Sequence, residues 1–297
     1  MNTDTGARAF PALLLSTGSL FHLPLPVVAA IARDAEFDGL ELIVNSPDIV
    51  PGPALAALDT VCPMRSLHAP FRDWSRWGGH LASWRATTAL ANALPGCTNV
   101  TLHPPGMRLA DAVHYRWFNR ATDLHELLDA KGRVGLSLEN LSWAAGSPFT
   151  RDPLERLLEQ CEARHIGLTL DVCHLGVSGR DVLAALDQVP ADILANVHFS
   201  DARGHQEHLF PGRGELPLAA FLTRLAGRGY AGYVTLELEP AALPDAPAAI
   251  VAALTRLREW MRGLLRSGEN GPVDREHRDA RTSRARDGRG DSSRLLA

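Results

Sequence analysis

The segment GLTLDVCH, residues 167–174, ends a short apolar run on an aspartate and continues into a histidine. Two further segments have the same form: GLSLE at residues 135–139 and YVTLE at residues 233–237 both end on a glutamate. Short apolar runs that follow a glycine are typical of buried strands in parallel sheets. The three segments therefore predict buried strands, each of which ends on a carboxylate.

Eight such runs occur along the chain, and each is followed by a stretch with the apolar spacing of a helix. We expect strands at residues 13–16, 39–44, 66–68, 100–103, 135–139, 167–171, 194–199 and 233–237. We expect helices near residues 26–35, 53–58, 80–94, 112–130, 153–163, 181–186, 217–226 and 248–265. This alternation predicts an α/β fold, a single (β/α)8 TIM barrel over residues 10–265.

The composition changes after residue 265. Residues 266–297 contain eight arginines and six acidic residues, mixed with glycine and serine and with few apolar side chains. Such a segment cannot bury enough apolar surface to fold, so we predict a disordered Arg-rich C-terminal tail. An Arg-rich tail could contact nucleic acid, but the interspersed acidic residues favour a solvated, inert extension.

Charge and cysteine content limit the partners and the compartment. The net charge is −4, and the part before the tail carries −6, which argues against nucleic acid as a partner. The four cysteines form no CxxC pair, which fits a reducing cytoplasm rather than a disulfide framework. No apolar run approaches the ~20 residues that span a bilayer, so we expect a cytoplasmic protein with no membrane partner.

In a TIM barrel the active site lies where the strands end, so the residues at these positions indicate the chemistry. Seven of the eight predicted strands carry ionisable residues at or near this end. They are Glu41, His68, His103, Glu139, Asp171 followed by His174, His198 followed by Asp201, and Glu237.

Several carboxylates at one barrel mouth need a compensating charge, because a buried ionised carboxylate is costly unless it is paired. Three carboxylates and one imidazole come from four consecutive predicted strands, a set of ligands that suits Mn, Mg, Co, Fe or Zn. A loop hydrogen bond would explain each residue taken singly, but seven polar strand ends together favour a metal site. The four predicted ligands are Glu139, Asp171, His198 and Glu237.

The order of these motifs resembles the xylose isomerase-like TIM barrel superfamily over residues 13–265. The segments that carry the resemblance are FDGLEL, LHAPF, LHPPG, LEN, LDVCH, VHFSDARG with HLFPGRGEL, and LELEP. The superfamily includes sugar phosphate isomerases and epimerases. The resemblance implies that the four predicted ligands hold one metal, that Glu139 and Glu237 act as acid and base, and that Arg203 contacts substrate or orients a carboxylate.

The same superfamily includes AP endonucleases of the endonuclease IV type (AP endonuclease family 2-like), which bind more metals. The resemblance to these enzymes implies a larger ligand set: His68, His103, Glu139, Asp171, His174, His198, His208 and Glu237. A ninth ligand, an aspartate two residues before His208, is Gln206 in this chain. A neutral amide is a weaker ligand than a carboxylate, so a third metal and endonuclease activity are less well supported.

Three residues outside the ligand set are predicted to contact substrate: Glu41, Arg203 and Trp74. Trp74 follows the third predicted strand and could stack on a sugar or pack against the next helix. The GRGE sequence lacks the lysine of a phosphate loop, and Ser200 lies in no GxSxG elbow, so neither motif predicts a further activity.

These observations favour a metal-dependent isomerase or epimerase of a small sugar, polyol or sugar phosphate. Dehydration of a cyclic polyol would use similar groups. The alternative is a multi-metal phosphodiesterase, and a binding protein without turnover is a third class. The expected partners are a divalent metal (Mn, Mg, Co or Zn) and a sugar-like molecule, and the sequence leaves a homodimer open.

Overall fold

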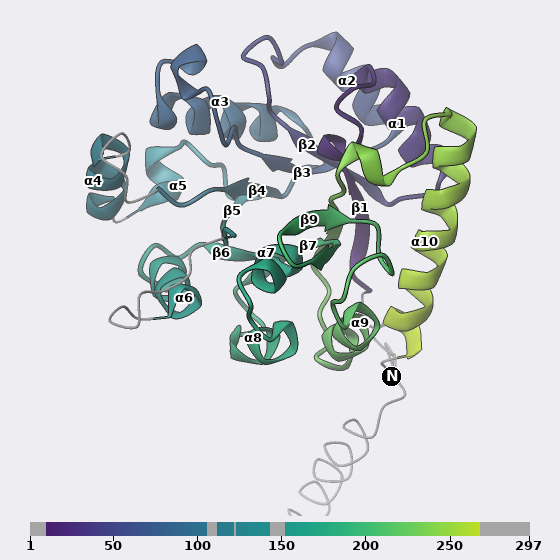
Figure 1. The fold of residues 1–297 in the computed structure, drawn as a ribbon. Helices are drawn as coiled ribbons and strands as arrows, with labels where there is room; N and C mark the ends of the chain where they lie inside the picture. Colours follow the sequence, from purple (N-terminus) through teal and green to yellow (C-terminus); the bar gives the residue numbers. More distant parts are fainter. Residues whose placement is uncertain (1–9, 106–111, 122, 143–151, 268–297) are drawn as a thin grey trace, which may run out of the picture.

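The computed structural model describes residues 10–105, 112–121, 123–142 and 152–267. Eight parallel strands form a closed barrel, with the neighbours in the order β1-β10-β7-β6-β5-β4-β3-β2, and Figure 1 shows the helices arranged around it. The barrel strands are β1 (Ala12–Ser16), β2 (Gly39–Ile43), β3 (Met64–His68), β4 (Asn99–Leu102), β5 (Gly135–Glu139), β6 (Gly167–Asp171), β7 (Leu194–Phe199) and β10 (Tyr233–Leu236). The predicted (β/α)8 barrel is confirmed.

The helices follow the strands as the sequence predicts, except that one helix and one hairpin are additional and one predicted helix is divided in two. They are α1 (Leu25–Asp34), α2 (Pro53–Val61), α3 (His80–Ala93), α4 (Ala112–Arg120), α5 (Leu124–Leu127), α6 (Pro153–Ala163), α7 (Val172–Val177), α8 (Val182–Gln188), α9 (Leu218–Gly227) and α10 (Pro247–Ser267). Helix α7 and a hairpin of β8 (Asp201–Arg203) and β9 (Gln206–Leu209) are additional. The single helix predicted at 112–130 is wrong: Asp123 caps a separate helix, α5, by accepting a hydrogen bond from the Glu126 N–H.

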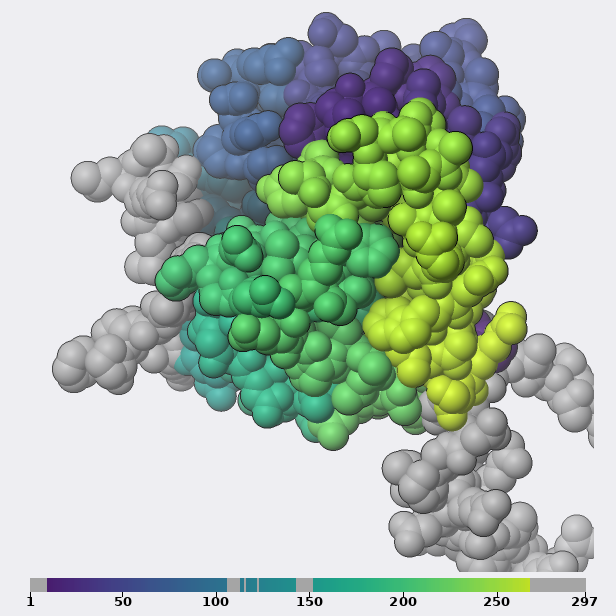
Figure 2. All heavy atoms as spheres, turned by 45° about the vertical axis from the view of Figure 1, so that its right-hand side comes forward, coloured from purple at the N-terminus to yellow at the C-terminus, as the bar shows by residue number. Residues whose placement is uncertain are grey.

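Local sequence explains where several helices begin. Pro53 and Pro153 occupy first-turn positions, where the missing N–H has no helical partner to lose. Asp152 also caps α6 by accepting from the Leu154 N–H at 2.8 Å. Helix α10 packs between α1 and α9, which joins the C-terminal and N-terminal parts of the barrel wall (Figure 2).

Helix α10 continues to Ser267, two residues beyond the predicted end of the barrel. The remainder of the predicted tail, residues 268–297, lies outside the described residues. Within the part of the chain that the structure describes, no helix is both long and apolar enough to cross a membrane.

The barrel interior is polar in two successive layers. Six strands carry a polar–apolar–polar triplet at their carboxyl ends, for example Ser66-Leu67-His68 in β3 and Ser137-Leu138-Glu139 in β5. Because side chains alternate along a strand, both polar residues face inward and the central apolar residue packs against the helices. The polar positions are buried, except that the last residues of two triplets, His103 and Glu237, are half-buried. The remaining triplets are Thr101-Leu102-His103, Thr169-Leu170-Asp171, Asn196-Val197-His198 and Thr235-Leu236-Glu237.

Candidate metal centre

The last residues of the triplets form an upper polar layer at the barrel mouth, and the first residues form a lower polar layer beneath it. The upper layer brings together the four residues predicted as ligands of one metal. Each stands at or just beyond the carboxyl end of a barrel strand, and these strands, β5, β6, β7 and β10, are neighbours in the barrel. Ligand atoms of the four side chains lie within 4.8 Å of one another. The four residues are Glu139, Asp171, His198 and Glu237.

The His198 ring lies among the three carboxylates. Its Nδ1 atom is 3.0 Å from Glu139 Oε1, 2.8 Å from Glu237 Oε2 and 3.8 Å from Asp171 Oδ2. Only the contact with Glu139 has the geometry of a hydrogen bond. Asp171 Oδ2 and Glu237 Oε2 are buried without a hydrogen-bond partner. These unpartnered carboxylate oxygens lie beside an imidazole nitrogen, a combination that suits a divalent cation. A cation binds the lone pairs of oxygen and nitrogen, so these atoms would need no hydrogen-bond donor.

A second group shares Glu139 with the first. The Nε2 atoms of His68 and His103 both lie 3.0 Å from Glu139 Oε2. His68 Nδ1 lies 2.7 Å from the carbonyl oxygen of Ala69, so this nitrogen carries a proton. The structure therefore brings His68 and His103 to the same carboxylate, as the larger predicted ligand set requires.

A third group contains His174, His208 and Glu207. The sequence interpretation missed Glu207, because the resemblance to endonucleases placed ligands at positions 206 and 208 only. Strand alternation in β9 would likewise put residues 206 and 208 on one face and residue 207 on the other. His208 adopts a left-handed conformation, with φ of 53°, which interrupts this alternation next to Glu207. Glu207 Oε1 is buried and has no hydrogen-bond partner. A carboxylate is thus present one residue away from Gln206, where the resemblance to endonucleases placed an aspartate.

Asp201 supports the hairpin that carries this third group. It is buried, and its carboxylate accepts hydrogen bonds from the backbone N–H groups of Ala202, Gly212, Gly214 and Leu216 at 2.9–3.1 Å. A Cβ atom at Gly214 would lie 2.2 Å from Asp201 Oδ1, so only glycine fits there. Asp201 therefore holds the loop that connects β9 with α9.

Carboxylates and imidazoles shift one another's pKa values in this site. Burial raises the pKa of a carboxyl, but His198 outweighs burial at Glu237 and lowers its pKa to about 2. The pKa of Glu139 is also held well below its usual value by neighbouring imidazoles, which outweigh burial, while burial raises that of Asp171. Burial alone would lower the pKa of His174, but nearby carboxylates, Asp171 first, raise it to about 9. The site therefore favours positive charge, which a divalent cation would supply.

The predicted substrate contacts lie in three different environments. Glu41 is fully buried and pairs in register with Ser66, so it belongs to the lower polar layer, beneath the ligand ring. The Arg203 side chain is largely exposed on β8, where it lies 3.5 Å from Glu215 Oε1. Trp74 donates to the carbonyl oxygen of Pro70 at 2.8 Å and its ring lies on that of His80. A substrate contact for Glu41, Arg203 and Trp74 stays a prediction.

Phe71 is the aromatic side chain that reaches the histidines. Its ring centroid is 5.7 Å from that of His103 and 6.0 Å from that of His68, and the side chain is partly exposed. The guanidinium carbon of Arg72 lies over the Phe71 ring, 5.3 Å from its centroid. Phe71 therefore contacts the second histidine group from the loop after β3.

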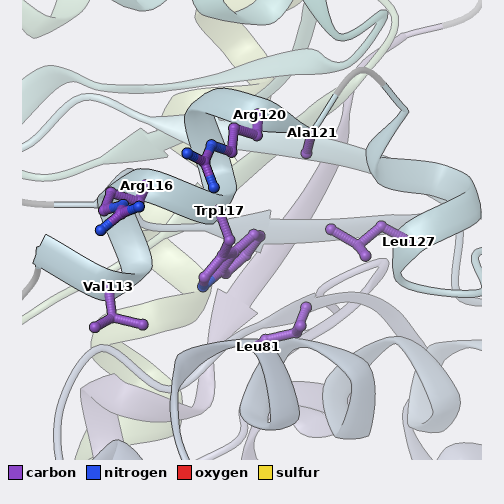
Figure 3. Close-up of a pocket in the computed structure, with 7 residues that line it drawn as sticks. All are labelled: Leu81, Val113, Arg116, Trp117, Arg120, Ala121 and Leu127. Carbon is purple, nitrogen blue, oxygen red and sulfur yellow. The ribbon is translucent and has the colours of Figure 1, made fainter.

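A pocket of about 430 Å³ lies outside the barrel, between α3, α4 and α5 (Figure 3). Trp117 lies at its centre, and Arg116 and Arg120 supply its charged groups. None of its seven lining residues belongs to the three histidine and carboxylate groups. The pocket is therefore separate from the candidate metal centre.

Comparison with known proteins relates the chain to one family and to several curated relatives. The model of a family described as xylose isomerase-like TIM barrel matches residues 29–260. An uncharacterized protein of Mycobacterium leprae is 27% identical over 263 residues, which covers 78% of this chain and 90% of that protein. A fructoselysine 3-epimerase of Escherichia coli O157:H7 is 27% identical over 126 residues, or 41% of this chain and 46% of the epimerase.

Solved structures with the same barrel include proteins of different activities. A 3-keto-D-glucoside 4-epimerase from E. coli has a TM-score of 0.63 and 18% identity, covering 85% of this chain and 99% of the epimerase. The IolI protein with bound zinc has a TM-score of 0.58 and 16% identity, covering 86% and 98%. Endonuclease IV from Thermus thermophilus has a TM-score of 0.59 and 19% identity, covering 85% and 100%. At these identities the likeness shows a shared fold.

Proposed function

The chain belongs to the xylose isomerase-like TIM barrel family, and on that premise we propose that it isomerises or epimerises a small sugar, polyol or sugar phosphate. The observation that carries the proposal is the group of Glu139, Asp171, His198 and Glu237, with two buried carboxylate oxygens that have no hydrogen-bond partner. These four side chains would hold one divalent metal.

Glu139 and Glu237 would move the proton. Both have lowered pKa values, so both are ionised near neutral pH and either can accept a proton from a carbon beside a carbonyl group. They reach the centre from different strands, β5 and the end of β10, which suits removal of a proton on one face of the substrate and its return on the other. The bound cation would stabilise the negative charge that develops on the substrate oxygen.

The relatives support this reaction class. The fructoselysine 3-epimerase and the 3-keto-D-glucoside 4-epimerase both act on sugar derivatives, and IolI binds zinc in the same fold. Arg203, on β8, and Phe71, on the loop after β3, are candidates for contact with the substrate.

A second candidate function is metal-dependent hydrolysis of a phosphodiester. The observation that favours it is Glu207, which completes a third ligand group with His174 and His208 where Gln206 had argued against one. Hydrolases that use two or more metals place them on groups such as these. The likeness to endonuclease IV is consistent with this candidate.

Metal content and proton exchange distinguish the two candidates. We expect one tightly bound divalent metal per chain by elemental analysis, and exchange of a carbon-bound substrate proton with D2O when a panel of ketoses and their phosphates is followed by NMR. Two or three metals, together with cleavage of a model phosphodiester or of an abasic-site duplex, would favour hydrolysis. A metal-loaded protein that exchanges no proton across the panel contradicts the isomerase proposal.

A further inference from the structure

Glu41 lies directly beneath the candidate metal centre and contacts one of its ligands. Its Oε1 atom is 2.9 Å from His198 Nε2, across the barrel interior from β2 to β7. Both side chains are fully buried. The contact does not have hydrogen-bond geometry, so each of these two atoms is left without a hydrogen-bond partner among the described residues. His198 therefore has a carboxylate at each end of its ring, Glu41 at Nε2 and Glu139 at Nδ1.

The other oxygen of Glu41 is held by a fixed set of donors. Oε2 accepts from Ser66 Oγ at 2.7 Å, from Asn196 Nδ2 at 2.9 Å and, more weakly, from Thr101 Oγ1 at 3.4 Å. Asn196 Oδ1 accepts from Thr235 Oγ1, so its amide nitrogen must point toward Glu41. Ser66 Oγ accepts from Asn99 Nδ2, so its own proton is directed to Glu41. The lower polar layer thus orients the Glu41 carboxylate.

We propose that Glu41 is a positioning residue: when a metal is bound, the facing Oε1 atom accepts the proton on His198 Nε2 and thereby keeps the lone pair of Nδ1 directed at the metal. The inference rests on the proposed metal centre. Metal-binding histidines donate their second ring nitrogen to an oxygen acceptor, which sets both the tautomer and the ring orientation. Burial of both partners excludes water as a substitute for the carboxylate.

Only a carboxylate satisfies both sides of this position. It must accept from Ser66 and Asn196 on one side and from His198 on the other. A glutamine at position 41 would present its oxygen to the donors and its NH2 group to His198 Nε2. His198 Nε2 would then be an acceptor, the ring proton would move to Nδ1, and Nδ1 could no longer bind a metal.

The test compares metal affinities at constant pH, with Mn2+ as the probe because the carboxylate-rich group suits it better than the histidine-rich groups. We expect Glu41→Gln to raise the Mn2+ dissociation constant about 10- to 100-fold. The double variant Glu41→Gln/Asn196→Asp offers an acceptor for the glutamine NH2 group, so it should recover part of the lost affinity. If Glu41→Gln weakened Mn2+ binding only by disturbing the packing of the lower polar layer, the double variant would recover no affinity.

Thr169→Val is the matched control. Thr169 lies in the same buried layer and bonds to Thr101 and Ser137, but it contacts neither Glu41 nor His198. We expect this variant to lose thermal stability while its Mn2+ dissociation constant stays near that of the wild type. A loss of affinity equal to that of Glu41→Gln would overturn the inference.

A measurement on the wild-type protein decides the matter even if Glu41→Gln does not fold. In the Zn2+-loaded protein, 1H–15N correlation spectra should show His198 with a proton on Nε2 and the metal on Nδ1. Metal on Nε2 overturns the positioning role. If His198→Ala abolishes Mn2+ binding but Glu41→Gln binds as the wild type does, only this inference is wrong. If His198→Ala also binds normally, the proposed metal centre itself is wrong.

Discussion

At the scale of single residues, the proposed chemistry depends on two glutamates, Glu139 and Glu237. Both have lowered pKa values, and each keeps an oxygen within 3.0 Å of His198 Nδ1. Asp171 differs from them because its pKa is raised and its Oδ2 atom lies farther from His198 Nδ1, at 3.8 Å. Under the proposed function, this difference favours Glu139 and Glu237 for proton transfer and Asp171 as a ligand only.

We expect Glu139→Gln and Glu237→Gln each to lower kcat about 10²- to 10⁴-fold, because an amide cannot accept the substrate proton. Each variant keeps one of the two carboxylates, so one of them should still exchange the proton of one substrate epimer with D2O without forming the other epimer. Exchange and product formation are followed together by NMR.

Glu259→Gln, an exposed substitution on α10, is the control for the loss of one acidic side chain and should leave kcat unchanged. Full activity in both Glu139→Gln and Glu237→Gln would contradict proton transfer by these two glutamates. Metal content is measured for each variant, because Glu139 and Glu237 are also predicted ligands.

The residues that the sequence predicted well are those whose position follows from strand alternation alone. Glu139, Asp171, His198 and Glu237 all end strands and meet as expected. Local geometry decides the positions of two other residues, of which Glu41 was predicted at a strand end and Glu207 was not predicted. Glu41 is one inward position lower through its register with Ser66, and Glu207 joins its group beside a left-handed residue that no sequence pattern indicates.

At the scale of elements, the β8–β9 hairpin is the part of the site that depends most on one side chain. The Asp201 carboxylate accepts four backbone hydrogen bonds and is buried, whereas the hairpin itself has only two short strands. The hairpin was not predicted because its strands are short and polar, and nothing in their spacing distinguishes them from a loop.

We expect Asp201→Ala to lower the free energy of unfolding by about 1.5–3 kcal/mol, because it leaves buried backbone donors without their charged acceptor. Hydrogen exchange should speed up in residues 202–216. Urea unfolding and amide exchange measure the two effects.

The control is Asp181→Ala, which removes the cap of α8 and its bonds to the N–H groups of Leu183 and Ala184. Capping substitutions cost about 1 kcal/mol, and this one should leave exchange in the hairpin unchanged. Equal exchange rates in the two variants would show that Asp201 does not hold the loop.

At the scale of the whole molecule, the metal-free protein should lose stability as the pH rises. The folded-state pKa of His174 is about 9, above the value of about 6.5 for an unfolded histidine. The folded state therefore holds a proton that the unfolded state releases, so the stabilisation is complete below pH 6.5 and is lost as the pH rises through 9. His68 and His198, whose pKa values are also raised, act in the same direction.

Urea unfolding of chelator-treated protein at about pH 6.5 and about pH 9 measures this loss. Metal-loaded protein should show the opposite trend, because protons and the cation compete for the same imidazoles. His174→Gln is expected to flatten the pH dependence of the metal-free protein. A metal-free protein that is more stable at the higher pH than at the lower one would contradict the charge balance described for the site.

The polar–apolar–polar triplets of the six strands also have a consequence for how the chain finds its fold. A one-residue slip of any of these strands would put a leucine or valine into the barrel and press two polar side chains against the helices. In β5, β6 and β10 the second of these would be a carboxylate. Two effects raise the free energy of such a misaligned pairing: a carboxylate loses its hydration against the helices, and an apolar side chain lies among the hydroxyl groups of the barrel interior. The polar residues proposed for the chemistry thus also disfavour misaligned pairing of the strands.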